Sequence, residues 1–210
     1  MRKGVCVPMI ALCLLLAGCG GTEETKAANV RDRYHDMAGC SMTAVVSCTQ
    51  EDQRWEATLQ CEYIPDGEST VEVLEPETIA GVRAKLSDTD WSLEYEGNVL
   101  NIGPLSDEEI SPVASLPRLM NALRDGWLLE ENQEKWGEVP CLRITVDQSG
   151  VQDGKILSTL WLRQDDGTPL RGEISVDGEI ILTAEFTGFA FYRVFFAQSK
   201  QLLILIQFHS

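Results

Sequence analysis

The side chains that most often carry catalysis are few and isolated in this sequence of 210 residues. His35 stands beside Asp36, with neither a nucleophile elbow of the Gly-x-Ser-x-Gly type nor a flanked reactive cysteine to accompany it. No zinc-protease, phosphate-loop or dinucleotide-binding motif is present. Asp88-Thr89-Asp90 begins like a calcium loop, but Leu93 stands where that loop requires glycine. We therefore predict no catalytic residue, no metal site and no cofactor.

Acidic side chains are abundant, and their pairing could suggest glycoside hydrolysis, which needs two carboxyl groups about 5 to 9 Å apart. The runs Asp107-Glu108-Glu109, Glu130-Glu131 and Asp165-Asp166 stand in predicted turns, where a solvated charge is the usual state. With 33 Asp and Glu against 17 Lys and Arg, such runs arise by chance. The formal net charge of -16 also makes nucleic acid an unfavourable partner. We expect a protein that is not an enzyme and binds no nucleic acid.

The thiol of Cys19 is the side chain with the clearest chemical role. Arg2 and Lys3 precede an apolar run over 5–16, which is shorter than the ~20 residues of a membrane-spanning helix. Small residues follow, and Leu16-Ala17-Gly18-Cys19 resembles the bacterial lipobox, in which the cysteine takes a diacylglycerol thioether and becomes the new N-terminus.

This pattern predicts a lipoprotein signal peptide over 1–18, lipidation of Cys19 and a small polar tether over 19–26. Two or three acyl chains anchor a protein stably, since each buried methylene contributes ~0.8 kcal/mol. We expect the mature protein to be held at the outer face of the cell membrane.

Four further cysteines follow, namely Cys40, Cys48, Cys61 and Cys141. Outside the cytoplasm they allow up to two disulfides in three connectivities, which the sequence does not rank. None has the spacing of a zinc or redox pair. Structural disulfides and buried thiols therefore both stay open.

Period-two alternation of apolar and polar residues predicts short antiparallel strands. It is clearest from Trp55 to Tyr63, and it recurs over 71–73, 82–86, 91–95, 142–146 and 180–186. Turn signals separate these segments at 66–67, 96–98, 153–154, 166–167 and 177–178. Together the segments and turns predict ten or eleven strands in hairpins.

Two segments have helical spacing instead. The first carries Ala27, Val30, Tyr34 and Met37 and is expected to end near Gly39; the second carries Leu116, Leu119, Met120 and Leu123 and ends at Gly126. Pro117 requires either a turn before the second helix or a bend in it. A lone apolar helix among strands has to cover the dry face of the sheet. We predict a mainly β, α+β fold: a curved antiparallel half-barrel of ten or eleven strands with a helix on its concave face.

Several motifs then favour a particular family: Val71 to Glu77, Ile79 to Val82, Leu93 to Gly97, Ser111 to Gly126, Leu160 to Leu162, Pro169 and Glu185 to Phe189. In this order they resemble the LolA/LolB-like lipoprotein-carrier superfamily, and most closely its lipobox-bearing members in spore-forming Gram-positive bacteria. The resemblance covers about 30–191, within an expected domain over 27–191. It implies a half-barrel that binds an apolar ligand, such as a lipid or a lipoprotein acyl chain.

The resemblance also implies an alternative, an envelope or spore-associated module that stabilises a protein partner such as a cell-wall amidase. The apolar side chains expected to face the ligand are Trp55, Leu59, Trp91, Tyr95, Leu119, Leu123, Trp161 and Phe186. The same side chains could form an ordinary core. If the helix over 116–126 fills the space inside the half-barrel, no ligand site remains there, and a protein-partner function is favoured over a carrier function.

The tail over 192–210 departs from the family pattern. All six phenylalanines lie from Phe186 onward, and no acidic residue follows Glu185. Leu202 to Ile206 is an unbroken apolar stretch, too short to span a membrane. Three explanations are open: an extra strand at the edge of the half-barrel, a membrane-touching appendage, and an altered reading frame that replaced the usual ending, which we favour.

Overall fold

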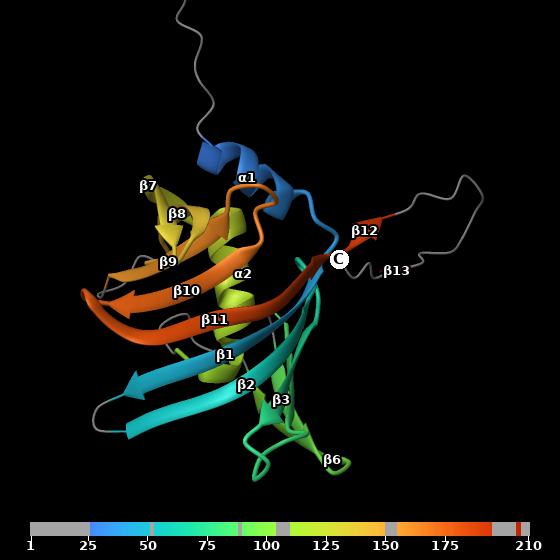
Figure 1. The fold of residues 1–210 in the computed structure, drawn as a ribbon. Coiled ribbons are helices and arrows are strands. Elements are labelled where there is room, and N and C mark those ends of the chain that lie inside the picture. The colour runs from blue at the N-terminus through green and yellow to red at the C-terminus, as the bar shows by residue number, and fades with distance from the viewer. Residues whose placement is uncertain are drawn as a thin grey trace, which may run out of the picture.

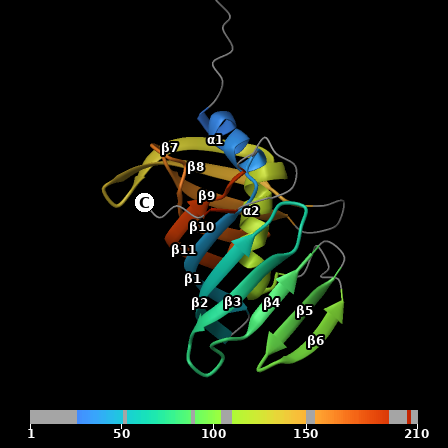
Figure 2. The ribbon, with the colours of Figure 1, turned by 90° about the vertical axis from the view of Figure 1, so that its right-hand side faces the viewer.

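A single antiparallel sheet of eleven strands wraps around one helix (Figures 1 and 2). The computed structural model describes residues 26–50, 53–87, 90–103, 110–149, 155–194 and 205–206. The predicted signal peptide, Cys19 and all but the last residue of the tether lie outside these ranges. The sheet order is β6-β5-β4-β3-β2-β1-β11-β10-β9-β8-β7. The predicted half-barrel with a helix against one face is confirmed.

The elements of the first half are α1 Lys26–His35, β1 Cys40–Gln50, β2 Gln53–Tyr63, β3 Ser69–Glu75, β4 Arg83–Leu86, β5 Trp91–Tyr95 and β6 Asn98–Gly103. A short 3-10 turn, η1 Pro112–Ala114, leads into α2 Ser115–Asp125. The second half is β7 Trp127–Trp136, β8 Val139–Asp147, β9 Ile156–Arg163, β10 Pro169–Val176 and β11 Glu179–Phe191. Two short strands follow, β12 Arg193–Val194 and β13 Leu205–Ile206.

The first and last long strands meet in the middle of the sheet. β1 pairs with β2 on one side and with β11 on the other, so the two halves of the chain form one continuous surface. The inner side chains of β1 are all buried, namely Cys40, Met42, Ala44, Val46 and Cys48. This strand was not predicted from the sequence, because small and sulfur-containing residues give a weaker alternation than the aliphatic and aromatic residues of β2.

Helix α2 supplies the apolar surface that covers the inner face of the sheet. Leu116, Leu119, Met120, Ala122 and Leu123 are fully buried. Pro117 lies in the first turn of α2, where its missing N–H removes no helical hydrogen bond, and η1 precedes the helix. The expected turn before the helix is therefore present.

Helix α1 is fixed to the end of α2. The Arg31 guanidinium donates from Nε to the Leu123 carbonyl oxygen at 2.7 Å, and from Nη2 to the carbonyl oxygens of Arg124 at 3.2 Å and Gly126 at 2.5 Å. The carbonyls of Leu123 and Arg124 belong to the last turn of α2 and that of Gly126 to its C-cap, and such groups have no helical N–H to pair with them. A second contact joins α1 to the loop between β9 and β10, because the Tyr34 hydroxyl donates to the Gly167 carbonyl oxygen at 2.7 Å. α1 ends at His35, earlier than expected.

The described part of the tail does not extend the main sheet. β12 pairs with β13, Arg193 opposite Ile206 and Val194 opposite Leu205. Neither strand pairs with the eleven-stranded sheet, whose edges are β6 and β7. For these residues the extra edge strand considered from the sequence is not found. Tyr192 still belongs to the domain, because its N–H donates to the Gly39 carbonyl oxygen at 2.8 Å.

We predict that Leu119→Asp lowers the free energy of unfolding by ~3 kcal/mol or more, because it buries an unpaired charge. Asn121→Asp is the matched control. It puts the same charge on the exposed side of α2 and keeps an oxygen that accepts the Tyr63 hydroxyl, so a change within ~0.5 kcal/mol is expected. Urea unfolding measures both, and equal effects would contradict the packing of α2.

Candidate functional site

The inner face of the half-barrel is filled where α2 covers it. Leu59, Leu119 and Leu123 were expected to line a ligand hollow, and all three are 0% exposed. The packing is close on the sheet side as well, since a Cβ added to Gly172 on β10 would lie 2.7 Å from Leu119 Cδ1. The space between α2 and the sheet is therefore occupied by side chains of the core.

The inner face continues uncovered onto β5 and β6. Leu93 faces Ala84 on one side and Leu100 on the other, and directly opposed residues share a face, so all three lie on the inner face. Trp91 faces the buried Leu86 in the same way. Tyr95 follows Leu93 along β5 at two-residue spacing. Ile102 lies next to them, at an irregularity in register between Asn101, which faces Ser92, and Gly103, which faces Trp91. We call these five residues, Trp91, Leu93, Tyr95, Leu100 and Ile102, the wing face.

The wing face is apolar and open. Trp91 and Leu93 are half-buried and pack against the core, whereas Tyr95 is 43%, Leu100 63% and Ile102 42% exposed. Figure 2 shows β5 and β6 at the edge of the sheet, at the opposite end of the molecule from α1. Trp91 and Tyr95 were among the expected ligand-facing residues. Leu100 and Ile102 were missed, because adjacent Val99 and Leu100 hide the alternation of this short strand.

Trp55 and Phe186 lie on the inner face but away from the wing. Both are half-buried and pack against the core. Phe186 lies opposite Ala44 of β1, and Trp55 lies opposite Cys48 of β1. They extend the core along β1, β2 and β11 and do not join the exposed residues of β6.

Trp161 lies on the outer face of the sheet, contrary to the expectation from the sequence. Its neighbours Leu160 and Leu162 are both buried on the inner face, so the alternation of β9 turns Trp161 outward. There its ring lies 5.8 Å from that of Trp136. The Arg171 guanidinium lies 5.0 Å from the Trp136 ring and pairs with Glu173 at 2.8 Å. Trp161 is therefore part of a polar and aromatic cluster and not of the inner apolar surface.

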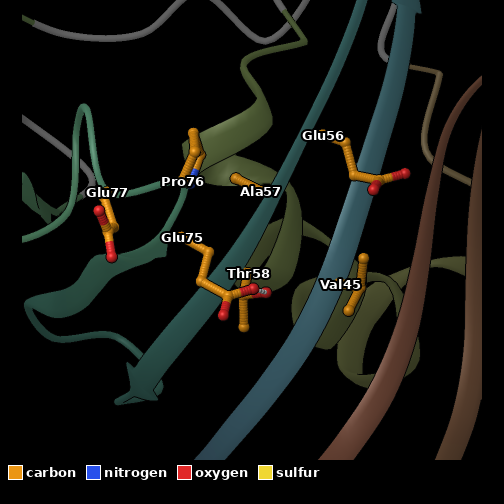
Figure 3. Close-up of a pocket in the computed structure, with 7 residues that line it drawn as sticks. All are labelled: Val45, Glu56, Ala57, Thr58, Glu75, Pro76 and Glu77. Carbon is orange, nitrogen blue, oxygen red and sulfur yellow. Dashed lines mark hydrogen bonds between the residues drawn. The ribbon is translucent and has the colours of Figure 1, made fainter.

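A hollow of about 380 Å³ lies at β1, β2 and the end of β3 (Figure 3). Its lining is Val45, Glu56, Ala57, Thr58, Glu75, Pro76 and Glu77. Thr58 donates its hydroxyl to Glu75 Oε2 at 3.0 Å across the two strands. Three carboxylates and no large apolar side chain line it, so this hollow does not have the chemistry of the expected apolar site.

The described residues offer little for catalysis. His35 is exposed on α1, and its Nδ1 lies 3.5 Å from Asp36 Oδ1. Within the described ranges no group of three or more His, Cys, Asp and Glu side chains could hold a metal ion. In the same part of the chain no helix is long and apolar enough to cross a membrane.

The four described cysteines are free thiols, and all are buried. Of the two possibilities left open by the sequence, the structure has buried thiols. Burial raises the pKa of Cys40 and of Cys61, and the nearby carboxyl of Glu62 raises both further. A thiol with a raised pKa holds little thiolate near neutral pH and is a poor nucleophile.

The comparisons with known proteins concern the fold. No protein-family model matches the sequence, and no curated protein matches it. The structure is similar to a LolA superfamily protein from Nitrosomonas europaea (12% identity, 79% of this chain and 93% of that chain covered, TM-score 0.46). It is also similar to an uncharacterized conserved protein from Thermus thermophilus (14%, 85% and 94%, TM-score 0.49) and to LprF from Mycobacterium bovis (13%, 78% and 90%, TM-score 0.46).

These similarities are similarities of fold. The half-barrel itself is established by the sheet order and register described above.

We predict that Cys40 and Cys61 react with iodoacetamide at pH 8 at least ~100-fold more slowly in the folded chain than in the chain unfolded by urea. Their burial and raised pKa values both lower the concentration of accessible thiolate. Mass spectrometry of peptides from the chain beginning at Gly20 measures each site. Similar rates in both states, or a disulfide between any two of the four cysteines, would contradict the described core.

Proposed function

We propose that this chain is a lipid-anchored, extracytoplasmic binding protein without enzymatic activity, and that the wing face is its binding surface. One observation carries the proposal: the inner face of a single sheet is filled beneath α2 and open on β5 and β6. Large apolar side chains exposed together, rather than singly, are typical of interaction sites. Scattered exposed residues would not support the same proposal.

The first candidate for the bound group is a lipid or a lipoprotein acyl chain, which the family resemblance implies. The wing face offers a strip of apolar side chains that continues from the core at Leu86 to Leu100 and Ile102. Each methylene that such a strip removes from water would contribute up to ~0.8 kcal/mol. This strip of side chains would cover only one side of a bound acyl chain.

The second candidate is the apolar surface of a protein partner at the cell envelope, of which a cell-wall amidase is the example that the resemblance implies. It is favoured by the filled space beneath α2. Small-ligand sites bury about 70 to 90% of their ligand, whereas an open strip leaves the other side to be covered by something else. A protein partner supplies that cover with its own side chains.

The proposed lipid anchor and the wing face would lie at opposite ends of the molecule. The chain enters the domain at α1, and the wing lies at the opposite end of the molecule (Figure 2). A tether attached at Cys19 would therefore hold α1 near the lipid and present the wing to the space beyond. We keep the signal peptide over 1–18 and the lipidation of Cys19 as parts of the proposal.

We predict that Cys19→Ala abolishes acyl labelling and moves the protein from the membrane fraction to the soluble fraction, because the thiol is the only route to the thioether. Radiolabelled fatty acid and cell fractionation measure the two effects. The control is the same variant truncated after Tyr192, which removes the apolar tail as a second anchor. Membrane retention of this truncated variant would contradict anchoring through Cys19.

We predict that Leu100→Asp at least halves the binding of the hydrophobic dye ANS to the folded chain beginning at Gly20, because a charge interrupts the wing face. Val99→Asp is the matched control, since Val99 is 60% exposed on the same strand but faces outward opposite Glu94. Equal dye binding by the two variants would contradict the wing face as the binding surface. Titration with a fluorescent C16 fatty acid, chosen as an acyl probe, then separates the candidates: saturable binding that Leu100→Asp weakens favours the acyl chain.

A further inference from the structure

We infer that the free edge of β6 takes up an extended, basic segment of a partner protein as an additional strand. The inference deepens the proposed function, on which it rests, by naming the partner class of the same wing. It concerns backbone groups at the edge of β6, whereas the wing face concerns side chains. The two can therefore be disrupted separately.

β6 is an edge strand with unpaired backbone groups. Among the described strands it pairs with β5 alone. Glu96 and Gly97 join the two strands with φ of 49° and 79°, the geometry of a two-residue type I′ turn. The residues that flank such a turn, Tyr95 and Asn98, exchange both hydrogen bonds, and the pattern then alternates along the ladder. The N–H and C=O groups of Val99 and Asn101 therefore point away from β5, toward the open edge.

The two edges of the sheet differ in protection against strand pairing. β7, at the other edge, carries Glu130, Glu131, Glu134 and Lys135. Charged side chains of this kind are a usual means of preventing edge-to-edge association. β6 has the sequence Asn-Val-Leu-Asn-Ile-Gly and contains no charge and no proline. The edge that could accept a strand is thus the one without charged side chains, over Asn98 to Asn101 and before the irregularity in register that precedes Gly103, and it lies beside the wing face.

The acidic side chains of β5 and its flanking residues favour a partner segment with basic side chains. The described residues 90–103, which include β5 and β6, contain no Lys or Arg, and their acidic residues are Asp90, Glu94 and Glu96. Of these, Glu94 pairs with Lys85 of β4 at 3.4 Å. A strand with Lys or Arg between apolar residues would complement this surface, and its apolar side chains would extend the wing face over Leu100 and Ile102. A second copy of this chain would instead bring another acidic wing into contact, which like-charge repulsion disfavours.

The test uses the full chain in nanodiscs of neutral phosphatidylcholine and a fluorescent peptide, about as long as β6, in which valine and lysine alternate. Fluorescence anisotropy measures binding. Asn101→Pro removes an outward N–H at an edge position that tolerates proline, and Asn101→Ala is the matched control that keeps this N–H. We expect saturable binding to the native chain and to Asn101→Ala, and binding at least about tenfold weaker to Asn101→Pro.

Two further peptides test the chemistry without changing the protein. A peptide with N-methyl groups along one edge cannot pair as a strand, and a peptide with glutamate in place of lysine reverses the charge. Both are expected to lose binding to the native chain. If Asn101→Pro does not fold, as judged by thermal unfolding, the N-methylated peptide decides the point by itself.

Several results would overturn the inference. One is equal affinity of the peptide for Asn101→Pro and Asn101→Ala, and another is undiminished binding of the N-methylated or glutamate peptide. Equal binding of the peptide to nanodiscs without protein would also overturn it. So would a dimer of this chain, seen in sedimentation, that Asn101→Pro abolishes. Such a result leaves the proposed function standing if Leu100→Asp still lowers dye binding. Loss of both effects would overturn the inference and the proposed function together.

Discussion

The burial of one apolar helix face against one curved sheet holds this structure together. A single sheet with an apolar inner face is unstable in water until something covers it. α2 is the covering element, in contact with β2, β8, β9 and β10. Five apolar side chains of α2 are 0% exposed. Burial of each of the larger ones, the leucines and the methionine, contributes roughly 1.5 to 3 kcal/mol. The Arg31 guanidinium then joins α1 to the end of α2, so the position of α1 depends on the same helix.

The size of that helix explains why part of the sheet remains open. α2 has 11 residues, which at 1.5 Å per residue gives a length of ~16 Å. Eleven strands spaced ~4.8 Å apart extend over ~48 Å along the curve. One short helix cannot cover such a width, even with α1 beside it. The uncovered inner face at β5 and β6 is therefore a consequence of the same packing that fills the centre.

The outer face follows a different principle. Ion pairs link neighbouring strands there, such as Arg83 with Glu72 at 2.7 Å and Arg171 with Glu185 at 2.9 Å. Exposed pairs of this kind contribute at most ~1 kcal/mol each. These charged side chains keep the outer face hydrated and unsuited to apolar contacts. β6 has no such side chains, and this contrast distinguishes its edge from the rest of the surface.

Local patterns in the sequence were sufficient for much of the fold. The stripe from Leu116 to Leu123 predicted α2, and the turn at Glu96-Gly97 predicted the β5–β6 hairpin, because helical periodicity and tight-turn chemistry depend on neighbouring residues only. The cysteine pattern, by contrast, left disulfides and buried thiols equally open. The strand β1 was missed, since its cysteine, methionine and alanine side chains are recognisably interior only once β2 and β11 lie beside them.

The candidate site was decided by tertiary structure. Leu160-Trp161-Leu162 is apolar throughout, so the sequence could not show which residues face inward, and a shift of one residue exchanges the two faces of a strand. Likewise Leu59 and Leu100 are both apolar strand residues, yet one is covered by α2 and the other is open. That difference depends on where a helix distant in sequence comes to rest on the sheet, and no local pattern contains this information.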